Sequence, residues 1–329
     1  MTTINEIAAM ANVSRTTVSR VLNNSGYVSE DARTKILKVI EETGYVPSQQ
    51  AKSLRTKKTK VIGVILPTIK TETSGRLVAG MDEVLAQEGY QILLANTNHE
   101  KHKEIEFINL LKVRQVDGII LAATNVNDEL LEKISQLNIP FVAIGQEFDG
   151  VTNVLFDDYN AARDMTRLLI DKGHSRIGFI GVDESDRAVG YLRKKAFLDE
   201  MKQAKITVED AWVQKGVFNI ESGYEAVARM FKDSLELPTA VFAVTDRLAV
   251  GAMRYLNQYH FKIPEDIAIA GVGASEMSKY VTPPLTTIDY LNEAAGREAA
   301  QLLINKITEN HKGKEKVVLS YRLLERDSV

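Results

Sequence analysis

The chain has 329 residues, of which 44% are hydrophobic and 26% are charged, with a formal net charge of −3. These values are typical of a soluble globular protein with more than one domain. The chain contains no cysteine, which excludes disulfides, a catalytic thiolate and cysteine metal sites. Its N-terminus is polar and holds no apolar segment of the signal-peptide type, so we predict a cytoplasmic protein.

Residues 4–23 predict two short amphipathic helices that are separated by a break at Asn12, Val13 and Ser14. Ser14 stands where a helix N-cap oxygen is needed, and the outward face of the second helix is polar. This spacing is typical of a helix-turn-helix and makes DNA the first candidate partner; the alternative is the polar face of a small helical bundle. The apolar stripes consist of Ile4, Ile7, Ala8 and Ala11, then Val18, Val21 and Leu22.

A third amphipathic helix is predicted from about residue 30 to 43, with Ser29 as its N-cap and Gly44 at its end. We expect Ile36, Leu37 and Ile40 to point inward, so that three helices share a minimal core.

The charge is unevenly distributed along the chain. Residues 1–60 carry ten basic and five acidic side chains, a net of +5, whereas the remainder carries 31 basic and 39 acidic side chains, a net of −8. Because phosphate contacts supply the sequence-independent part of DNA affinity, the basic first segment favours a DNA-binding head.

The segment that follows this head contains Pro47, which suits the first position of a helix, and leaves residues 48–54 for only two helical turns. An isolated helix of that length is marginal in water, so the segment is a candidate switch that folds when something packs against it. The alternative is a basic, solvated tether.

From Lys60 onward, short β-branched runs alternate with amphipathic helices, among them 77–87, 103–113 and 161–171. This alternation predicts parallel, doubly wound α/β sheets, and about 260 residues are too many for one core, so we expect two lobes. A ligand is expected in the crevice beyond the carboxyl ends of the strands. The predicted strands are 61–66, 92–95, 118–121, 141–144, 176–180, 240–244 and 267–270.

The sequence shows no carrier for enzymatic chemistry. Gly271, Val272 and Gly273 are too short a glycine signal for dinucleotide binding, and neither a Walker motif nor a nucleophile elbow is present. The five histidines show no metal-ligand spacing. We therefore predict that the protein is not an enzyme and uses neither a cofactor nor a metal.

Motifs spaced along nearly the whole chain resemble those of the LacI/GalR (lactose-repressor/galactose-repressor) family. In the head, the matching positions are Ile7-Ala8, Val13-Ser14, Thr17 to Asn23, Val28-Ser29, Arg33, Ile36 and Gly44 to Pro47. In the body, they are Ile62 to Val64, Gly173-His174, Ile177, Thr245-Asp246, Ala249 to Gly251, Pro283 to Ile288 and Leu324 to Ser328.

This resemblance implies an α/β fold with an N-terminal three-helix helix-turn-helix head over residues 1–46, a hinge helix and linker over 47–59, and an effector-binding, dimerising core over 60–329. The core is expected to be periplasmic-binding-protein-like, with one lobe over about 60–157 and 291–317 and the other over about 158–288 and 318–329. The implied partners are a double-stranded DNA operator, a small effector and a second copy of the chain. The chain ends without a leucine heptad tail, so a homodimer is expected.

The resemblance also implies which residues contact DNA. Arg15, Thr16 and Arg20 match the base-facing positions, and Leu54 with Ala51 matches the pair that packs at the dimer axis and opens a base step. The residues that match the backbone-positioning set are Thr3, Ser14, Thr17, Ser19, Asn23, Tyr27, Ser29 and Tyr45.

For the effector, Phe156 and Phe218 match an apolar wall and an aromatic platform, and Arg187 matches an arginine that grips sugar hydroxyls, with Asp183 on the same loop. Further polar residues on strand-end loops are Thr71, Thr73, Ser74, Gln146, Asp246 and Tyr290. The alternative for each of these residues is ordinary capping or packing.

The chain departs from the family pattern at two places. Thr245 replaces an asparagine, and Val272 to Glu276 replaces a Tyr-Asp-Asp segment, so that two hydroxyl ligands are missing or replaced. Glu276 is the candidate for the lost carboxylate. We expect a disaccharide such as sucrose, or a sugar phosphate bound by Arg187, rather than a galactoside.

Three functions are compatible with these features. The first is a repressor of a carbohydrate-utilisation operon that a sugar releases from a palindromic operator. The second is a catabolite-control regulator whose DNA binding is enhanced by a phosphorylated carrier protein, which would dock in part on the helix over 292–307. The third is a sugar-binding module without a regulatory role. The basic head and the polar N-terminus disfavour this third function.

Overall fold

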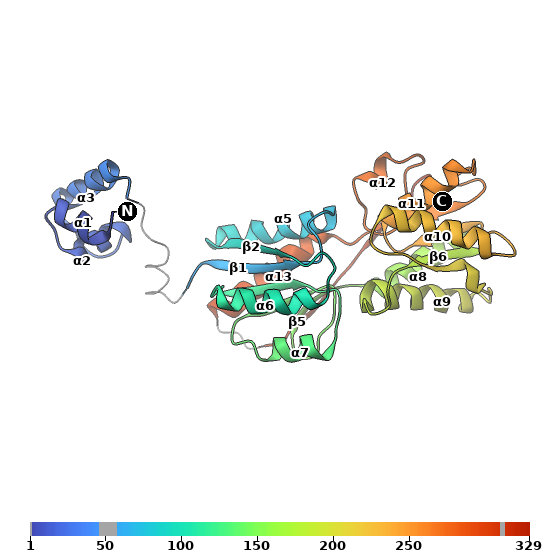
Figure 1. Ribbon diagram of the computed structural model, residues 1–329, viewed down its shortest axis with the longest axis horizontal. Coiled ribbons are helices and arrows are strands. Elements are labelled where there is room, and N and C mark those ends of the chain that lie inside the picture. The colour runs from blue at the N-terminus through green and yellow to red at the C-terminus, as the bar shows by residue number, and fades with distance from the viewer. Residues whose placement is uncertain (1, 46–57, 310–312) are drawn as a thin grey trace. The chain divides into compact units, whose positions relative to one another are not determined.

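The computed structural model describes residues 2–45, 58–309 and 313–329 and divides into two compact units, Met1–Lys60 and Val61–Val329. The first unit consists of α1 (Ile4–Met10), α2 (Arg15–Leu22) and α3 (Glu30–Thr43) (Figure 1). Side chains from all three helices form its core, among them Ile7, Val18 and Ile36, each of which is completely buried. The predicted three-helix head is therefore present.

Local capping sets the limits of these helices, as predicted. The Ser14 hydroxyl accepts a hydrogen bond from the Thr17 amide at 3.1 Å, the Ser29 hydroxyl caps α3, and Gly44 ends α3 in the left-handed conformation. The expected inward position of Leu37 is wrong, because Leu37 is half exposed and Val39 is buried in its stead. Leu37 is the next residue after Ile36, and this rotation of about 100° carries it away from the core stripe.

The first lobe of the second unit is built on a six-stranded parallel sheet of order β11-β5-β4-β3-β1-β2 (Figure 1). Helices α5 and α13 cover one face, and α6 and α7 cover the other. The strands are β1 (Val61–Leu66), β2 (Gln91–Asn96), β3 (Gly118–Ala122), β4 (Phe141–Ile144), β5 (Thr152–Phe156) and β11 (Lys316–Leu319). The helices are α5 (Glu72–Gln87), α6 (His102–Val113), α7 (Asp128–Ser135) and α13 (Asn292–Thr308).

The second lobe is built on a four-stranded parallel sheet of order β7-β6-β8-β9, with α8 and α9 on one face and α10 and α11 on the other. A short antiparallel pair, β10 (Thr287–Asp289) with β12 (Arg322–Leu324), adjoins it through a bridge between Ala270 and Thr286. The strands of the four-stranded sheet are β6 (Ile177–Gly181), β7 (Val213–Lys215), β8 (Ala240–Ala243) and β9 (Ala268–Ala270). Its helices are α8 (Asp158–Asp171), η1 (Arg187–Leu192), α9 (Arg193–Gln203), η2 (Asp210–Trp212), α10 (Ile220–Asp233), α11 (Asp246–Gln258) and α12 (Met277–Tyr280).

The chain passes between the two lobes three times, after β5, after β10 and after β11. All seven predicted strands are present, whereas β5, β7, β10, β11 and β12 were not predicted. Two helices begin a turn or so earlier than predicted, α5 at Glu72 and α8 at Asp158, because their first turns are mostly polar and lack an apolar stripe.

Helices α5 and α13 approach each other closely through two glycines. A Cβ atom on Gly80 would lie 2.0 Å from the Glu293 carbonyl oxygen, and one on Gly296 would lie 2.1 Å from the Leu77 carbonyl oxygen. Only glycine permits this separation of the two backbones. The contact fixes the N-terminal end of α5, from which several residues of the site described below project.

Candidate functional site

Helix α2 presents a polar, exposed face on the first unit. Val18 and Val21 are buried against α1 and α3, whereas Arg15, Thr16 and Arg20 are exposed. These three side chains carry hydrogen-bond donors and lie close together on a short helix that begins at a sharp turn. In such an arrangement they can reach base edges in a major groove.

The remaining predicted DNA-contact residues divide into three groups. Thr3, Ser14 and Ser29 cap α1, α2 and α3, so their hydroxyls already hold helix-end amides. Tyr27 is 87% exposed and Asn23 is also exposed, whereas Thr17, Ser19 and Tyr45 are partly buried. Ala51 and Leu54, together with the predicted hinge helix, lie outside the described residues.

In the second unit, a cavity of about 280 Å³ lies between the two lobes. Loops from the carboxyl ends of β1, β3 and β4 line it from the first lobe, and loops from β6, β8 and β9 line it from the second. This is the position predicted for a ligand in doubly wound sheets. The predicted effector residues in its wall are Thr71, Thr73, Ser74, Gln146, Phe156, Phe218, Asp246 and Tyr290.

Aromatic rings form much of the apolar wall. Phe156 and Tyr290 lie at the crossover between the lobes, with ring centroids 5.2 Å apart. The Phe218 ring of the second lobe stacks on the His99 imidazole of the first at 4.9 Å and 7°. Burial lowers the pKa of His99, which favours its neutral form. One face of the expected aromatic platform is therefore covered by a side chain from the opposite lobe.

Arg193 is the buried cation of the cavity. Its side chain is 7% exposed and pairs with the Asp158 carboxylate at 2.6 Å. It also donates a hydrogen bond to the Val244 carbonyl, and its guanidinium lies 5.0 Å from the centre of the Tyr290 ring. Most of its charge is thus compensated within the protein, which leaves little for an anionic ligand.

Two further carboxyl groups are buried in the wall. Asp186 accepts hydrogen bonds from Gln146 Nε2 at 2.7 Å and from the Val189 amide at 2.9 Å. Asp246 accepts one from the Thr287 hydroxyl and one from the Ser275 amide. Burial raises the pKa of both carboxyl groups, because a low-dielectric surrounding disfavours the charged form.

Behind the wall, the buried Glu104 holds the loop after β3. Its carboxylate accepts hydrogen bonds from the Thr124 amide at 2.9 Å, the Thr124 hydroxyl at 2.8 Å and Asn125 Nδ2 at 2.7 Å. Burial raises the pKa of Glu104 despite these bonds. Because Thr124 lines the cavity, Glu104 positions part of the wall.

Replacing Glu104 by glutamine is expected to change how stability depends on pH. Since the pKa is raised in the folded state, the wild type loses stability as pH rises from the ordinary carboxyl value, about 4.3, through the folded-state value. Glutamine does not titrate. Urea unfolding at a series of pH values should show the free energy of unfolding of the wild type falling relative to Glu104→Gln as pH rises. A constant difference would contradict this, and Glu106→Gln, an exposed change on the same helix, is the control.

Three predicted effector residues lie outside the cavity wall. Arg187 is exposed, with its guanidinium 5.5 Å from the centre of the Tyr191 ring. Asp183 forms an ion pair with Lys215 at 2.6 Å, and the hydrogen bond from Lys215 lowers the pKa of Asp183. The Glu276 side chain turns to Lys279, at 3.1 Å, so it does not supply the lost carboxylate in this conformation.

Several lining residues were not predicted, in particular His99, Asp158, Asp186 and Arg193. Asp158 is the first residue of α8 and lies two residues after β5, a strand that was also missed. Arg193 follows a π-helical turn, η1, and the apolar periodicity of a sequence does not predict such a turn. The one feature that could have indicated Arg193 is its position, about one and a half turns after Arg187 in a segment that follows a predicted strand.

The helix proposed to dock a phosphocarrier protein, α13, is largely occupied within its own lobe. Ala295, Ala299, Leu303 and other side chains are buried against α5 and the sheet. Glu293 and Gln301 are among its exposed residues. The phosphocarrier alternative has no support from this arrangement.

Comparison with known proteins agrees with this architecture. Residues 3–48 match the family described as "Bacterial regulatory proteins, lacI family", and residues 166–329 match a periplasmic binding protein-like domain. The chain is 32% identical to the HTH-type transcriptional repressor PurR of Haemophilus influenzae (strain PittEE), across 95% of this chain and 93% of that protein.

Solved structures show the same fold. The complex of the transcriptional regulator CelR with cellobiose has a TM-score of 0.76 at 27% identity and covers all of both chains. The Lac repressor dimer bound to operator and the anti-inducer ONPF has a TM-score of 0.90 at 22% identity, covering 99% of this chain and 98% of that one.

A helix-turn-helix head followed by a two-lobed core with a cavity between the lobes defines a ligand-responsive class of transcriptional repressor, not an enzyme. The chain belongs to the lacI family of bacterial regulatory proteins. No helix in the described ranges has the length and apolar character needed to span a membrane.

Proposed function

We propose that this repressor binds a palindromic operator as a homodimer and that a small, uncharged ring molecule in the interlobe cavity sets its operator affinity. The observation that carries this proposal is the cavity itself, in which residues from both lobes converge on one partly open volume. A ligand that contacts both lobes shifts any equilibrium between closed and open forms.

The charge of the wall supports an uncharged effector. The fully buried ionisable groups of the wall include one cation, Arg193, and three carboxyl groups, Asp158, Asp186 and Asp246. If Asp186 and Asp246 are ionised, this set repels an anion; if they are protonated, it offers no attraction beyond the Arg193–Asp158 pair. Lys70 and Arg247 also line the cavity, but Lys70 is exposed and Arg247 is only partly buried, so solvent weakens their attraction for an anion. The buried set therefore disfavours the sugar phosphate that the sequence suggested.

The size of the cavity supports a single ring. Ligand pockets typically measure roughly 300–1,000 Å³, and about 280 Å³ lies just below that range. A monosaccharide or a nucleobase fits this volume better than the disaccharide expected from the sequence. Phe156, Phe218 and Tyr290 offer ring surfaces to either ligand, and Gln146 and Asp246 offer polar groups.

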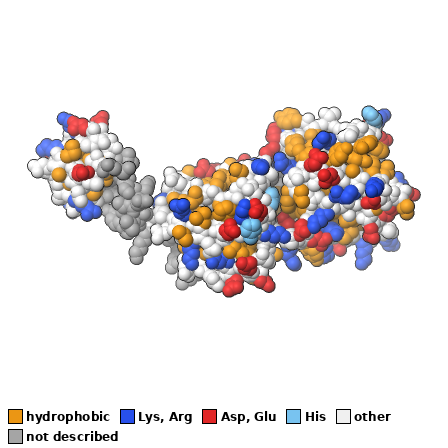
Figure 2. Space-filling view, viewed as in Figure 1, with side chains coloured by type: hydrophobic (Ala, Val, Ile, Leu, Met, Phe, Trp, Pro, Cys, Tyr) orange, Lys and Arg blue, Asp and Glu red, His pale blue; other side chains and the backbone are white. Residues whose placement is uncertain are grey.

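Exposed apolar side chains support the homodimer. On β2, an edge strand of the first lobe, Leu93 and Leu94 are 41% and 46% exposed. Figure 2 also shows hydrophobic side chains gathered on the second lobe near α10 and α11, where Tyr259 is 53% exposed. Such surfaces mark contacts between proteins, and a twofold dimer requires a twofold-symmetric operator.

A thermal-shift panel tests the ligand class. The probes are ribose, glucose, cellobiose, adenine and guanine, with ribose 5-phosphate and glucose 6-phosphate as charged counterparts. We expect an uncharged single-ring compound to raise the midpoint of unfolding, since a ligand at 100 times its Kd stabilises by about 2.7 kcal/mol. Gln146→Ala should abolish the shift and Arg187→Ala should retain it. Stabilisation by the phosphorylated compounds alone would contradict the proposal.

A further inference from the structure

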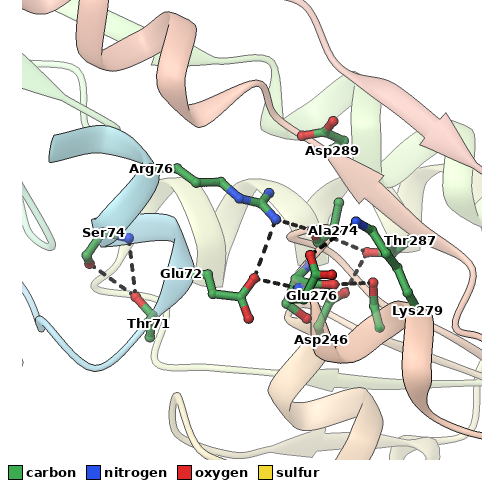
Figure 3. A network of polar contacts seen from close by, with 12 residues as sticks. Thr71, Glu72, Ser74, Arg76, Asp246, Ala274, Glu276, Lys279, Thr287 and Asp289 are labelled. Atoms are coloured by element: carbon green, nitrogen blue, oxygen red, sulfur yellow. Dashed lines mark hydrogen bonds and ion pairs between the residues drawn. The ribbon is translucent and has the colours of Figure 1, made fainter. Parts of the chain in front are cut away.

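At one edge of the cleft, side chains of α5 in the first lobe form hydrogen bonds with the backbone of the loop over 274–276 in the second lobe (Figure 3). Arg76 Nη2 donates a hydrogen bond to the Ala274 carbonyl at 2.8 Å, and the Glu276 amide donates one to Glu72 Oε2. Arg76 and Glu72 also pair with each other at 3.4 Å, one helical turn apart. Both contacts use backbone atoms of the loop, which fixes their geometry independently of the loop side chains.

The same loop is held from within its own lobe. Asp246 Oδ2 accepts a hydrogen bond from the Ser275 amide at 2.7 Å, and the Thr287 hydroxyl accepts one from the Ala274 amide at 3.2 Å. Ala274 is held at φ +45°, a left-handed conformation that costs energy for a residue with a Cβ atom. The loop is thus a rigid, strained surface that α5 can grip, rather than a segment that follows α5 when the lobes separate.

We propose that Glu72 and Arg76 form an interlobe latch that holds the cleft closed without a bound ligand, so that the closed form is the resting state of this repressor. Arg76 does not line the cavity, and its side chain is 27% exposed at the rim. Glu72 is among the residues that line the cavity, whereas the contact between Arg76 and Ala274 lies outside it. This half of the latch therefore stabilises closure through a contact that a ligand does not replace.

The structure supplies a reporter of closure on a different part of the cleft. There the Ala188 amide donates a hydrogen bond across the cleft to Gln146 Oε1 at 3.3 Å. Neither residue touches the latch. The Glu276 amide reports opening at the latch itself, whereas the adjacent Ser275 amide bonds within its own lobe and reports the integrity of the loop.

The test is hydrogen exchange at single-residue resolution on the full-length protein, without ligand or DNA, comparing the wild type with Arg76→Ala. This variant leaves the partners of all three reporter amides in place. We expect exchange at both Ala188 and Glu276 to accelerate at least tenfold, with Ser275 unchanged, and Arg76→Lys to be intermediate because it keeps a donor. Glu83→Ala is the matched control, since Glu83 lies on the same helix and pairs within its own lobe with Arg297.

Faster exchange at Glu276 alone, or at neither amide, would overturn the latch, because the cleft would then stay closed without it. Acceleration at Ser275 would show that the loop has lost its fold in Arg76→Ala. In that case, exchange at Ala188 and Glu276 in Arg76→Lys decides whether the latch holds the cleft closed. The role of the latch in regulation rests on the proposed function. The exchange measurement does not depend on the proposed function, because it needs no effector. A failure of the latch can therefore be distinguished from a failure of the proposed effector response.

Discussion

Replacing Arg193 by methionine is expected to lower the free energy of unfolding of the core by about 3–5 kcal/mol. The change leaves Asp158 as a buried carboxylate without its partner, since the two side chains are 7% and 2% exposed and lie 2.6 Å apart. It also removes the hydrogen bond to the Val244 carbonyl and the cation over the Tyr290 ring. Urea denaturation followed by circular dichroism measures this loss.

The second half of the pair provides the control. In Arg193→Met combined with Asp158→Asn, neither charge of the pair remains buried, so a large part of the loss should be recovered. Arg187→Met, an exposed arginine six residues earlier, should change stability by less than about 0.5 kcal/mol. A double variant as unstable as the sum of the two single variants would show that Arg193 and Asp158 act independently.

Replacing Arg15 by alanine is expected to weaken operator binding by about 1–3 kcal/mol, which is roughly 5- to 150-fold in Kd. Arg15 is the first residue of α2 and is exposed, so its loss removes a bidentate donor without disturbing the core formed by Val18 and Val21. Fluorescence anisotropy with an operator selected from a library of palindromes measures the effect.

The control for Arg15 removes an equal charge elsewhere on the head. Lys35 lies on α3 and pairs with Asp31 at 2.6 Å, so Lys35→Ala should lower affinity little. Arg15→Ala should also relax the preference for one base pair, which charge removal alone does not do. Equal losses for both variants, with unchanged sequence preference, would contradict base reading by α2.

The head could be predicted closely from sequence because its structure is set locally. Ser14, Ser29 and Gly44 cap their helices through contacts within four residues along the chain, and such contacts are visible in sequence. Leu37 was misplaced because two neighbouring apolar residues compete for one helical stripe, and only the packing of α3 against its neighbours decides between them.

The cavity was predicted less completely because its residues depend on long-range geometry. Gln146, Phe218 and Asp246 follow strands or begin helices, so the sheet topology alone brings them to the cleft. Arg193, by contrast, is turned inward by a π-helical turn, and His99 enters the wall through its stacking on a ring in the other lobe. Neither relation leaves a pattern in sequence. The latch likewise joins residues about 200 positions apart.

Occupancy of the interlobe cavity is expected to set the operator affinity of this repressor. The most direct test titrates the full-length protein against its selected operator, with and without the compound that stabilises it, in the wild type and in Gln146→Ala. We expect a change in Kd of roughly 5- to 150-fold for the wild type, which corresponds to a coupling free energy of about 1–3 kcal/mol, and no change for Gln146→Ala. A compound that stabilises the wild type through this cavity but leaves its operator affinity unchanged would contradict coupling between the cavity and the DNA-binding head.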